Sequence, residues 1–172
     1  MMRAWVGIGS NLGDRTAACS QGVAALGELA GTRLVRVSSL YLTEPVGLRL
    51  CEWFVNVVAE VETALGPDAL LEGLLAIERA AGRQRTGELA PRTLDLDILD
   101  AGGLTREDPR LTLPHPRMHL RRFQLEPLAE IAPRWIHPRL GRTARELLDA
   151  IEDASRIVRI ARLEGRGERR VA

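Results

Sequence analysis

The segment Pro91-Arg92-Thr93-Leu94-Asp95-Leu96-Asp97-Ile98-Leu99 alternates apolar and polar residues, which is typical of a β-strand with one buried face. We expect a strand over 93–99 whose leucine and isoleucine side chains enter the core. Asp95 and Asp97 then share the opposite face, with Cα atoms about 6.5–7 Å apart. A rigid strand that presents two carboxylates on one face is therefore the main indication of function in the sequence.

Two carboxylates this close repel each other unless a cation lies between them. Hard oxygen ligands select magnesium or manganese rather than zinc, and such a pair can hold two ions about 3.5–4 Å apart, which suits phosphoryl displacement. The alternative is a solvated strand face on which Asp95 and Asp97 pair with nearby arginines. The spacing alone leaves both interpretations open.

The pattern along the rest of the chain predicts an α+β fold. Strands are predicted over 4–10, 34–42 and 54–62, and helices over 14–29, 67–82 and 143–154. Residues 102–122, rich in glycine, proline and arginine, are expected to be mostly loop. Because strands and helices do not alternate strictly, helices packed on a largely antiparallel sheet are favoured. We expect one domain over 1–164 and a polar C-terminal tail over 165–172.

Composition excludes several classes of protein. The 172 residues are 45% hydrophobic and 27% charged, as in soluble globular proteins. The net charge of +1 disfavours a nucleic-acid partner. All the basic residues are arginine, which excludes a Schiff-base lysine and a lysine-dependent phosphate loop. No stretch approaches the roughly 20 apolar residues of a membrane span. Cys19 and Cys51 lack CxxC spacing, so we expect a cytoplasmic protein with reduced thiols.

Arginines surround the predicted aspartate pair. Arg83 and Arg85 lie in the loop before the strand, and Arg92 stands three residues before Asp95. The planar arginine fork matches phosphate oxygens two at a time, so this cluster suits a polyphosphate. Glu78 lies on the apolar stripe of the preceding helix. At that position its carboxylate is either salt-bridged at the helix edge or directed into a site.

A second segment with potential chemistry is Leu113-Pro114-His115-Pro116, which places a histidine between two prolines. Phe54 and Phe123 are the only phenylalanines of the chain. Core packing is the ordinary interpretation of each. The functional alternative is that they clamp a flat ring, with Asn56 supplying both a hydrogen-bond donor and an acceptor.

Taken together, these segments resemble the 6-hydroxymethyl-7,8-dihydropterin pyrophosphokinase family of folate biosynthesis. The resemblance rests on GSNLG at 9–13, YLTEPVG at 41–47, FVN at 54–56, IE at 77–78, GRQR at 82–85, PRTLDLD at 91–97, and LPH at 113–115 with Arg121 and Phe123. It implies a ferredoxin-like core in a three-layer αβα sandwich. It also implies transfer of the diphosphoryl unit of ATP to the pterin's hydroxymethyl oxygen, with release of AMP.

The resemblance further implies roles for single residues. Asp95 and Asp97 would hold two magnesium ions, and catalytic roles fall on Arg83, Arg92 and Asp97. The positions expected to bind ATP are Glu78, Arg83, Arg85, Arg92, Ile98, Thr112, His115 and Arg121. The positions expected to bind the pterin are Thr43, Glu44, Val46, Gly47, Phe54, Asn56, Asp95 and Phe123. We expect a monomer that binds these two small molecules and neither nucleic acid nor membrane.

The sequence departs from the family pattern at Leu89 and Ala90, where a Trp-Gly pair can precede Pro-Arg, so no aromatic lid contact is expected from this loop. Three rival functions remain. They are a metal-dependent nuclease or nucleotidyltransferase, a non-catalytic arginine-rich binding module, and a pyrophosphokinase that binds substrates without turnover. Formation of AMP and pterin diphosphate from MgATP and the hydroxymethyl pterin separates them.

Overall fold

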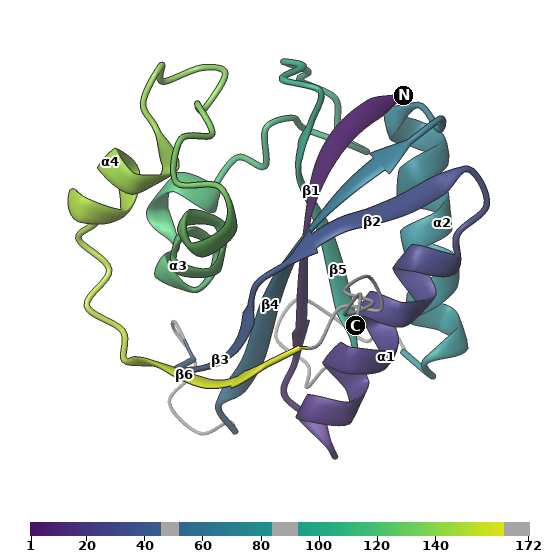
Figure 1. The fold of residues 1–172 in the computed structure, drawn as a ribbon, viewed down its shortest axis with the longest axis horizontal. Coiled ribbons are helices and arrows are strands. Elements are labelled where there is room, and N and C mark those ends of the chain that lie inside the picture. The colour runs from purple at the N-terminus through teal and green to yellow at the C-terminus, as the bar shows by residue number, and fades with distance from the viewer. Residues whose placement is uncertain (46–51, 84–92, 164–172) are drawn as a thin grey trace, which may run out of the picture.

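The computed structural model describes residues 1–45, 52–83 and 93–163. Within these ranges it contains a six-stranded sheet with helices on both faces (Figure 1). The strands are β1 (Met2–Ser10), β2 (Thr32–Val37), β3 (Ser39–Thr43), β4 (Phe54–Thr63), β5 (Asp95–Ala101) and β6 (Ile157–Arg162). The helices are α1 (Arg15–Glu28), α2 (Pro67–Ala80), the 3-10 turn η1 (Met118–Leu120), α3 (Arg122–Ile131) and α4 (Ala144–Asp149).

The strands run in the order β5-β1-β4-β3-β6, and β2 also pairs with β4. All of these pairings are antiparallel, as the sequence predicted. The central strands β1 and β4 are paired over nine residues, from Met2 opposite Thr63 to Ser10 opposite Val55. This long, continuous register fixes which side chains share a face at the far end of the sheet.

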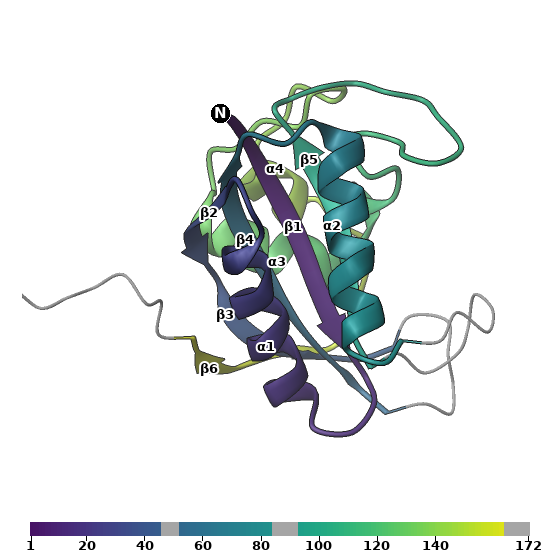
Figure 2. The same cartoon turned by 90° about the vertical axis from the view of Figure 1, so that its right-hand side faces the viewer.

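Helices α1 and α2 cover one face and helices α3 and α4 lie against the other, which confirms three layers (Figures 1 and 2). Under α1 and α2 lie buried residues such as Val6, Ile8 and Leu96. Under α3 and α4 lie Trp5 and Leu99 with apolar residues of those helices. Because neighbouring strand residues point to opposite faces, the single strand β1 supplies both cores.

Several predicted boundaries were wrong. The strand expected over 34–42 is two strands that meet at Ser38, whose backbone N–H donates to Val58 O at 2.9 Å. The helix expected over 143–154 begins after Thr143, with a capping box to Glu146, but ends at Asp149. The sequence prediction missed α3 and β6 entirely. The segment 102–122 is mostly loop, as expected, apart from η1.

Candidate active site

The antiparallel register brings the predicted metal and pterin residues into one row. Gly9 of β1 lies opposite Asp95 of β5 on one side and opposite Asn56 of β4 on the other. Directly opposed residues point to the same face, so Asp95 and Asn56 face the same way on either side of Gly9. Two strand spacings separate them by about 10 Å. Gly7 lies opposite Asp97 in the same manner, one row further along.

The two glycines add no side chain to this face of β1, and side chains of neighbouring strands approach both positions. A Cβ at Gly9 would lie 2.6 Å from Asn56 Oδ1, closer than real atoms approach. A Cβ at Gly7 would lie 3.3 Å from Leu99 Cδ2. Asn56 Nδ2 donates to Thr43 Oγ1 at 2.6 Å, which orients the amide. The sequence prediction did not assign a role to Gly7 or Gly9, although two glycines in an apolar strand were a usable signal.

Asp95 and Asp97 are both half-buried on this face. Arg83 Nη1 forms an ion pair with Asp95 Oδ1 and another with Glu78 Oε1. Glu78 is 2% exposed, and the same oxygen accepts the backbone N–H of Leu96 at 2.8 Å. Glu78 is therefore salt-bridged, as one alternative predicted, although it is buried, and its role in a site stays a prediction.

The carboxylates fit a magnesium ion that is bound together with a substrate. Within the described residues, no group of three or more His, Cys, Asp or Glu side chains could hold a metal by itself. Mg²⁺ demands octahedral oxygen coordination and usually takes one or two carboxylates plus phosphate oxygens and waters. Asp95 and Asp97 could supply that pair of carboxylates, since both lie half-buried on the same face of β5.

His115 lies in a stretch that is fixed to β5 by a hydrogen bond from its backbone N–H to Leu99 O, at 2.8 Å. Its Nδ1 accepts the backbone N–H of Arg117 at 3.2 Å, which leaves the proton on Nε2. Burial, with the charges of Arg121 and Arg117, lowers the pKa of His115 to about 4. The imidazole is therefore neutral at pH 7 and acts as a hydrogen-bond donor through Nε2.

The two phenylalanines lie outside the core. Phe54 begins β4 opposite Thr43, and Phe123 lies in the first turn of α3. Both are only partly buried, and neither belongs to the two buried apolar clusters. The guanidinium of Arg121 lies over the Phe123 ring, 5.5 Å from its centroid. Because Phe54 and Phe123 are partly exposed, their predicted stacking on a flat ligand stays a prediction.

Other predicted positions lie elsewhere. The Ile98 side chain is 4% exposed in the core under α1 and α2, on the face opposite the aspartates, so only its backbone could face a nucleotide there. Thr112 Oγ1 donates to Asp108 O at 3.2 Å. The remaining predicted positions, Val46, Gly47, Arg85 and Arg92, lie outside the described residues, as do Leu89 and Ala90.

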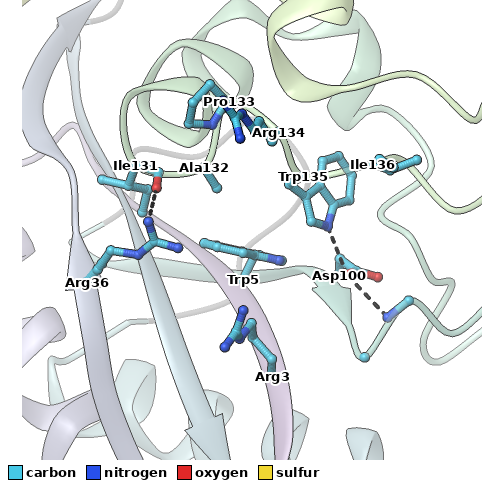
Figure 3. A pocket seen from close by; sticks show the side chains of 12 residues that line it. Arg3, Trp5, Arg36, Asp100, Ile131, Ala132, Pro133, Arg134, Trp135 and Ile136 are labelled. Atoms are coloured by element: carbon cyan, nitrogen blue, oxygen red, sulfur yellow. Dashed lines mark hydrogen bonds between the residues drawn. The ribbon is translucent and has the colours of Figure 1, made fainter.

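A separate hollow of about 710 Å³ lies beside the C-terminal end of α3, lined by residues that include Trp5, Arg36 and Trp135 (Figure 3). Trp135 Nε1 donates to Asp100 Oδ2 at 3.1 Å, and the Arg36 guanidinium lies 5.9 Å from the Trp5 ring centroid. No predicted site residue lines this hollow. Of the predicted residues, Glu78 and Arg83 lie with Asp95 at the other end of β5, and Asn56 lies in the same row of the sheet as Asp95.

Comparison with known proteins shows the family to which the chain belongs. The model of the 7,8-dihydro-6-hydroxymethylpterin-pyrophosphokinase (HPPK) family matches residues 5–133. This chain belongs to the HPPK family. It is 42% identical over 160 residues to the 2-amino-4-hydroxy-6-hydroxymethyldihydropteridine pyrophosphokinase of Methylorubrum extorquens, covering 93% of this chain and 99% of that protein. It is 44% identical over 150 residues to the Pseudomonas aeruginosa protein of the same name, covering 87% and 92%.

Solved HPPK structures share the fold. A Plasmodium falciparum HPPK-DHPS crystal structure superposes with a TM-score of 0.69 at 16% identity, covering 86% of this chain and 43% of that one. The ferredoxin-like HPPK fold and the activity of a pyrophosphokinase, an ATP-dependent diphosphotransferase, are therefore those that the sequence predicted. Within the described residues, no helix has the length and apolar character needed to cross a membrane.

Proposed function

We propose that this chain transfers the diphosphoryl group of ATP to the hydroxymethyl oxygen of 6-hydroxymethyl-7,8-dihydropterin on the face between Asp95, Asp97 and Asn56. The observation that carries the proposal is the row Asp95–Gly9–Asn56, which places an acidic group and an amide on one face about 10 Å apart, with a glycine as the strand residue between them. A flat substrate held at Asn56 would extend its reactive group toward the carboxylates.

The nucleotide belongs on the β5 side of this row. Asp95 and Asp97 would hold two Mg²⁺ ions together with the triphosphate, and these ions supply charge neutralisation and Lewis acidity when bound. Arg83 is already held between Glu78 and Asp95, so its guanidinium is positioned before the nucleotide arrives. His115 donates a hydrogen bond from its Nε2–H group to a phosphate oxygen. Arg121 supplies a further positive charge. Arg85, Arg92, Thr112 and the Ile98 backbone complete the proposed ATP contacts.

The pterin belongs on the β4 side. The Asn56 amide offers an acceptor and a donor to the ring edge, and Thr43 holds that amide in place. Phe54 and Phe123 would stack on the two faces of the ring. Glu44, Val46 and Gly47 are the remaining proposed pterin contacts.

The reaction forms one bond and breaks one. The hydroxymethyl oxygen bonds to the β-phosphorus while the bond from that phosphorus to the α-phosphate oxygen breaks. AMP leaves with that oxygen, and the hydroxyl proton is released. The arginines stabilise the charge that gathers on the transferred and departing oxygens, and Asp97 is the proposed proton acceptor.

The test replaces Asp95 and Asp97 by asparagine, singly and together, and measures AMP and pterin diphosphate from MgATP and the hydroxymethyl pterin. We expect at least a thousandfold loss of turnover in the double variant, with an unchanged circular dichroism spectrum. Mg²⁺ should also no longer strengthen binding of a non-hydrolysable ATP analogue in calorimetry. Asp149→Asn, an exposed aspartate on α4, is the matched control. Wild-type turnover in the double variant would exclude the assignment.

We further propose that the chain acts as a monomer in the cytoplasm and that residues 1–164 form its one domain. The thiol of Cys19 is buried beneath the sheet and unpaired among the described residues, which suits a reducing compartment. Size-exclusion chromatography with light scattering tests the monomer directly.

A further inference from the structure

The chain continues for 39 residues beyond the matched family segment, which ends at 133, and part of this extension returns to the pterin side of the site. Strand β6 pairs with the edge of β3, so that Ile157 lies opposite Thr43. Thr43 in turn lies opposite Phe54. The proposed pterin residues Thr43 and Phe54 therefore share a row with the first residue of β6.

The next row outward consists of Arg156, Glu44 and Trp53, and Arg156 contacts both of the others. Its backbone O accepts the Glu44 N–H at 2.9 Å, and its backbone N–H donates to Glu44 Oε2 at 3.0 Å. Its Nε lies 3.5 Å from the same carboxylate oxygen. Its guanidinium carbon lies 4.9 Å from the Trp53 ring centroid, within cation–π range. One arginine thus joins the end of β3 to the residue before β4.

These three side chains lie on the back of the site, so the proposed pterin contact of Glu44 would be made by its backbone. Successive residues in extended chain point to opposite faces, so Glu44 and Trp53 alternate with Thr43 and Phe54. The Trp53 carbonyl is also held by Arg15 of α1, the helix that covers the opposite face. Arg156 therefore acts on the pterin side through the residues next to Thr43 and Phe54.

We propose that Arg156 is a positioning residue for the pterin, which fixes the spacing of Thr43 and Phe54 by tying Glu44 to Trp53. This inference rests on the proposed function and adds a part of the chain that the family match does not cover. Because the Arg156 side chain is 72% exposed, its contacts are individually weak. The expected effect is accordingly a change in pterin affinity and not a loss of the fold.

The test is steady-state kinetics of Arg156→Ala with each substrate varied in turn. We expect KM for the hydroxymethyl pterin to rise about threefold to tenfold, while KM for MgATP and kcat stay within twofold of wild type. Arg156→Lys, which keeps a cation near Trp53, should recover most of the loss. Arg162→Ala is the matched control, because Arg162 lies exposed on the same strand with no side-chain partner among the described residues.

A second measurement isolates the contact between the two side chains. Trp53→Leu should raise the pterin KM by a similar factor, and the double variant Arg156→Ala/Trp53→Leu should be no worse than the worse single variant. Acrylamide should quench tryptophan fluorescence more strongly in Arg156→Ala, because the Trp53 ring loses its cover. If Arg156→Ala does not fold, Arg156→Gln with Trp53→Phe replaces it in the same cycle.

The outcomes distinguish this inference from the proposed function. If the wild-type chain forms no AMP from MgATP and the pterin, the proposed function fails and the kinetic effect of Arg156 with it. If the wild type is active but Arg156→Ala has wild-type pterin KM, the positioning role is wrong and the proposed function stands. Equal rises in both KM values, or the same rise in Arg162→Ala, would also overturn the positioning role.

Discussion

The residues that shape the site most strongly are those with the least side chain. Gly9 separates Asp95 of β5 from Asn56 of β4, and Gly7 separates Asp97 of β5 from Val58 of β4. Neither glycine adds a side chain to this face of the sheet. The sequence alternation was enough to place Asp95 and Asp97 on one face. The need for Gly9 could not be predicted, because it depends on Asn56, which is 47 positions away and adjoins it only through strand pairing.

Gly9→Ala tests this point. The new Cβ would meet Asn56 Oδ1 at 2.6 Å, so the amide has to move and its hydrogen bond to Thr43 is lost. We expect the kcat/KM for the pterin to fall at least tenfold and the stability to fall by about 1–3 kcal/mol, the usual cost of overpacking. Steady-state kinetics and urea unfolding measure the two effects. Gly27→Ala is the control, since its Cβ would make only an ordinary contact with Leu34, at 3.6 Å. A Gly9→Ala enzyme with wild-type kcat/KM for the pterin would contradict this role of Gly9.

At the level of elements, a buried carboxylate of α2 contacts β5 directly. Glu78 on the last turn of α2 accepts the Leu96 N–H and pairs with Arg83, so one side chain connects the helix, the strand and the site. Its place on an apolar helix stripe was visible in the sequence. The sequence could not decide between the two predicted roles of Glu78, because they depend on how closely β5 packs against α2.

Glu78→Ala is expected to destabilise the fold by about 2–4 kcal/mol, because it leaves the Leu96 N–H without its acceptor and removes one partner of Arg83. Glu78→Gln keeps an acceptor and should cost about half as much. Glu72→Ala on the exposed side of the same helix should change stability by less than about 0.5 kcal/mol, since its pair with Arg110 is at the surface. Chemical denaturation of the three variants gives the comparison. Equal losses for Glu72 and Glu78 would contradict it.

There are physical reasons why helix α3 and strand β6 could not be predicted from the sequence. Helix α3 contains Pro127, a residue that normally ends a helix, yet Leu125, Leu128 and Ala129 pack beneath it in the core. Tertiary packing outweighs the local preference there. Strand β6 has no buried residue and so lacks the alternation of a half-buried strand. Its position comes from backbone pairing with β3, which a single sequence does not display.

Across the whole molecule, the apolar cluster under α3 and α4 is smaller than the cluster under α1 and α2. The cluster under α3 and α4 includes Trp5, Val58 and Leu99 from the sheet and does not include Asn56 or Asp95, so the proposed site lies beyond the end of this cluster. Two histidines are also shielded from solvent, since His137 is buried and His115 is partly buried. Burial lowers the pKa of His115 to about 4, and burial together with His119 and Arg139 lowers the pKa of His137.

These histidines make the stability of the whole fold depend on pH between about 5 and 7. An unfolded histidine has a pKa near 6.5, so below that pH the unfolded chain binds more protons than the folded one. Stability is therefore full above pH 6.5 and is lost as the pH falls toward the lowered folded values. For His115 the loss between pH 8 and pH 5 is at most about 2 kcal/mol, or roughly 4–8 °C in Tm. Asp100 acts oppositely, since burial raises its pKa, and reduces the net change.

The measurement is Tm at half-unit steps from pH 5 to pH 8 for wild type, His115→Asn and His137→Asn. Wild type should lose Tm on acidification, and each asparagine variant should show a shallower slope because one buried titrating group is gone. Leu120→Ala, an exposed substitution nearby, should keep the wild-type slope at a similar Tm. Because the predicted slope comes from proton uptake by the unfolded chain, high salt should alter it little. A wild-type Tm that stays constant or rises from pH 7 to pH 5 would show that these imidazoles are not held neutral by the fold.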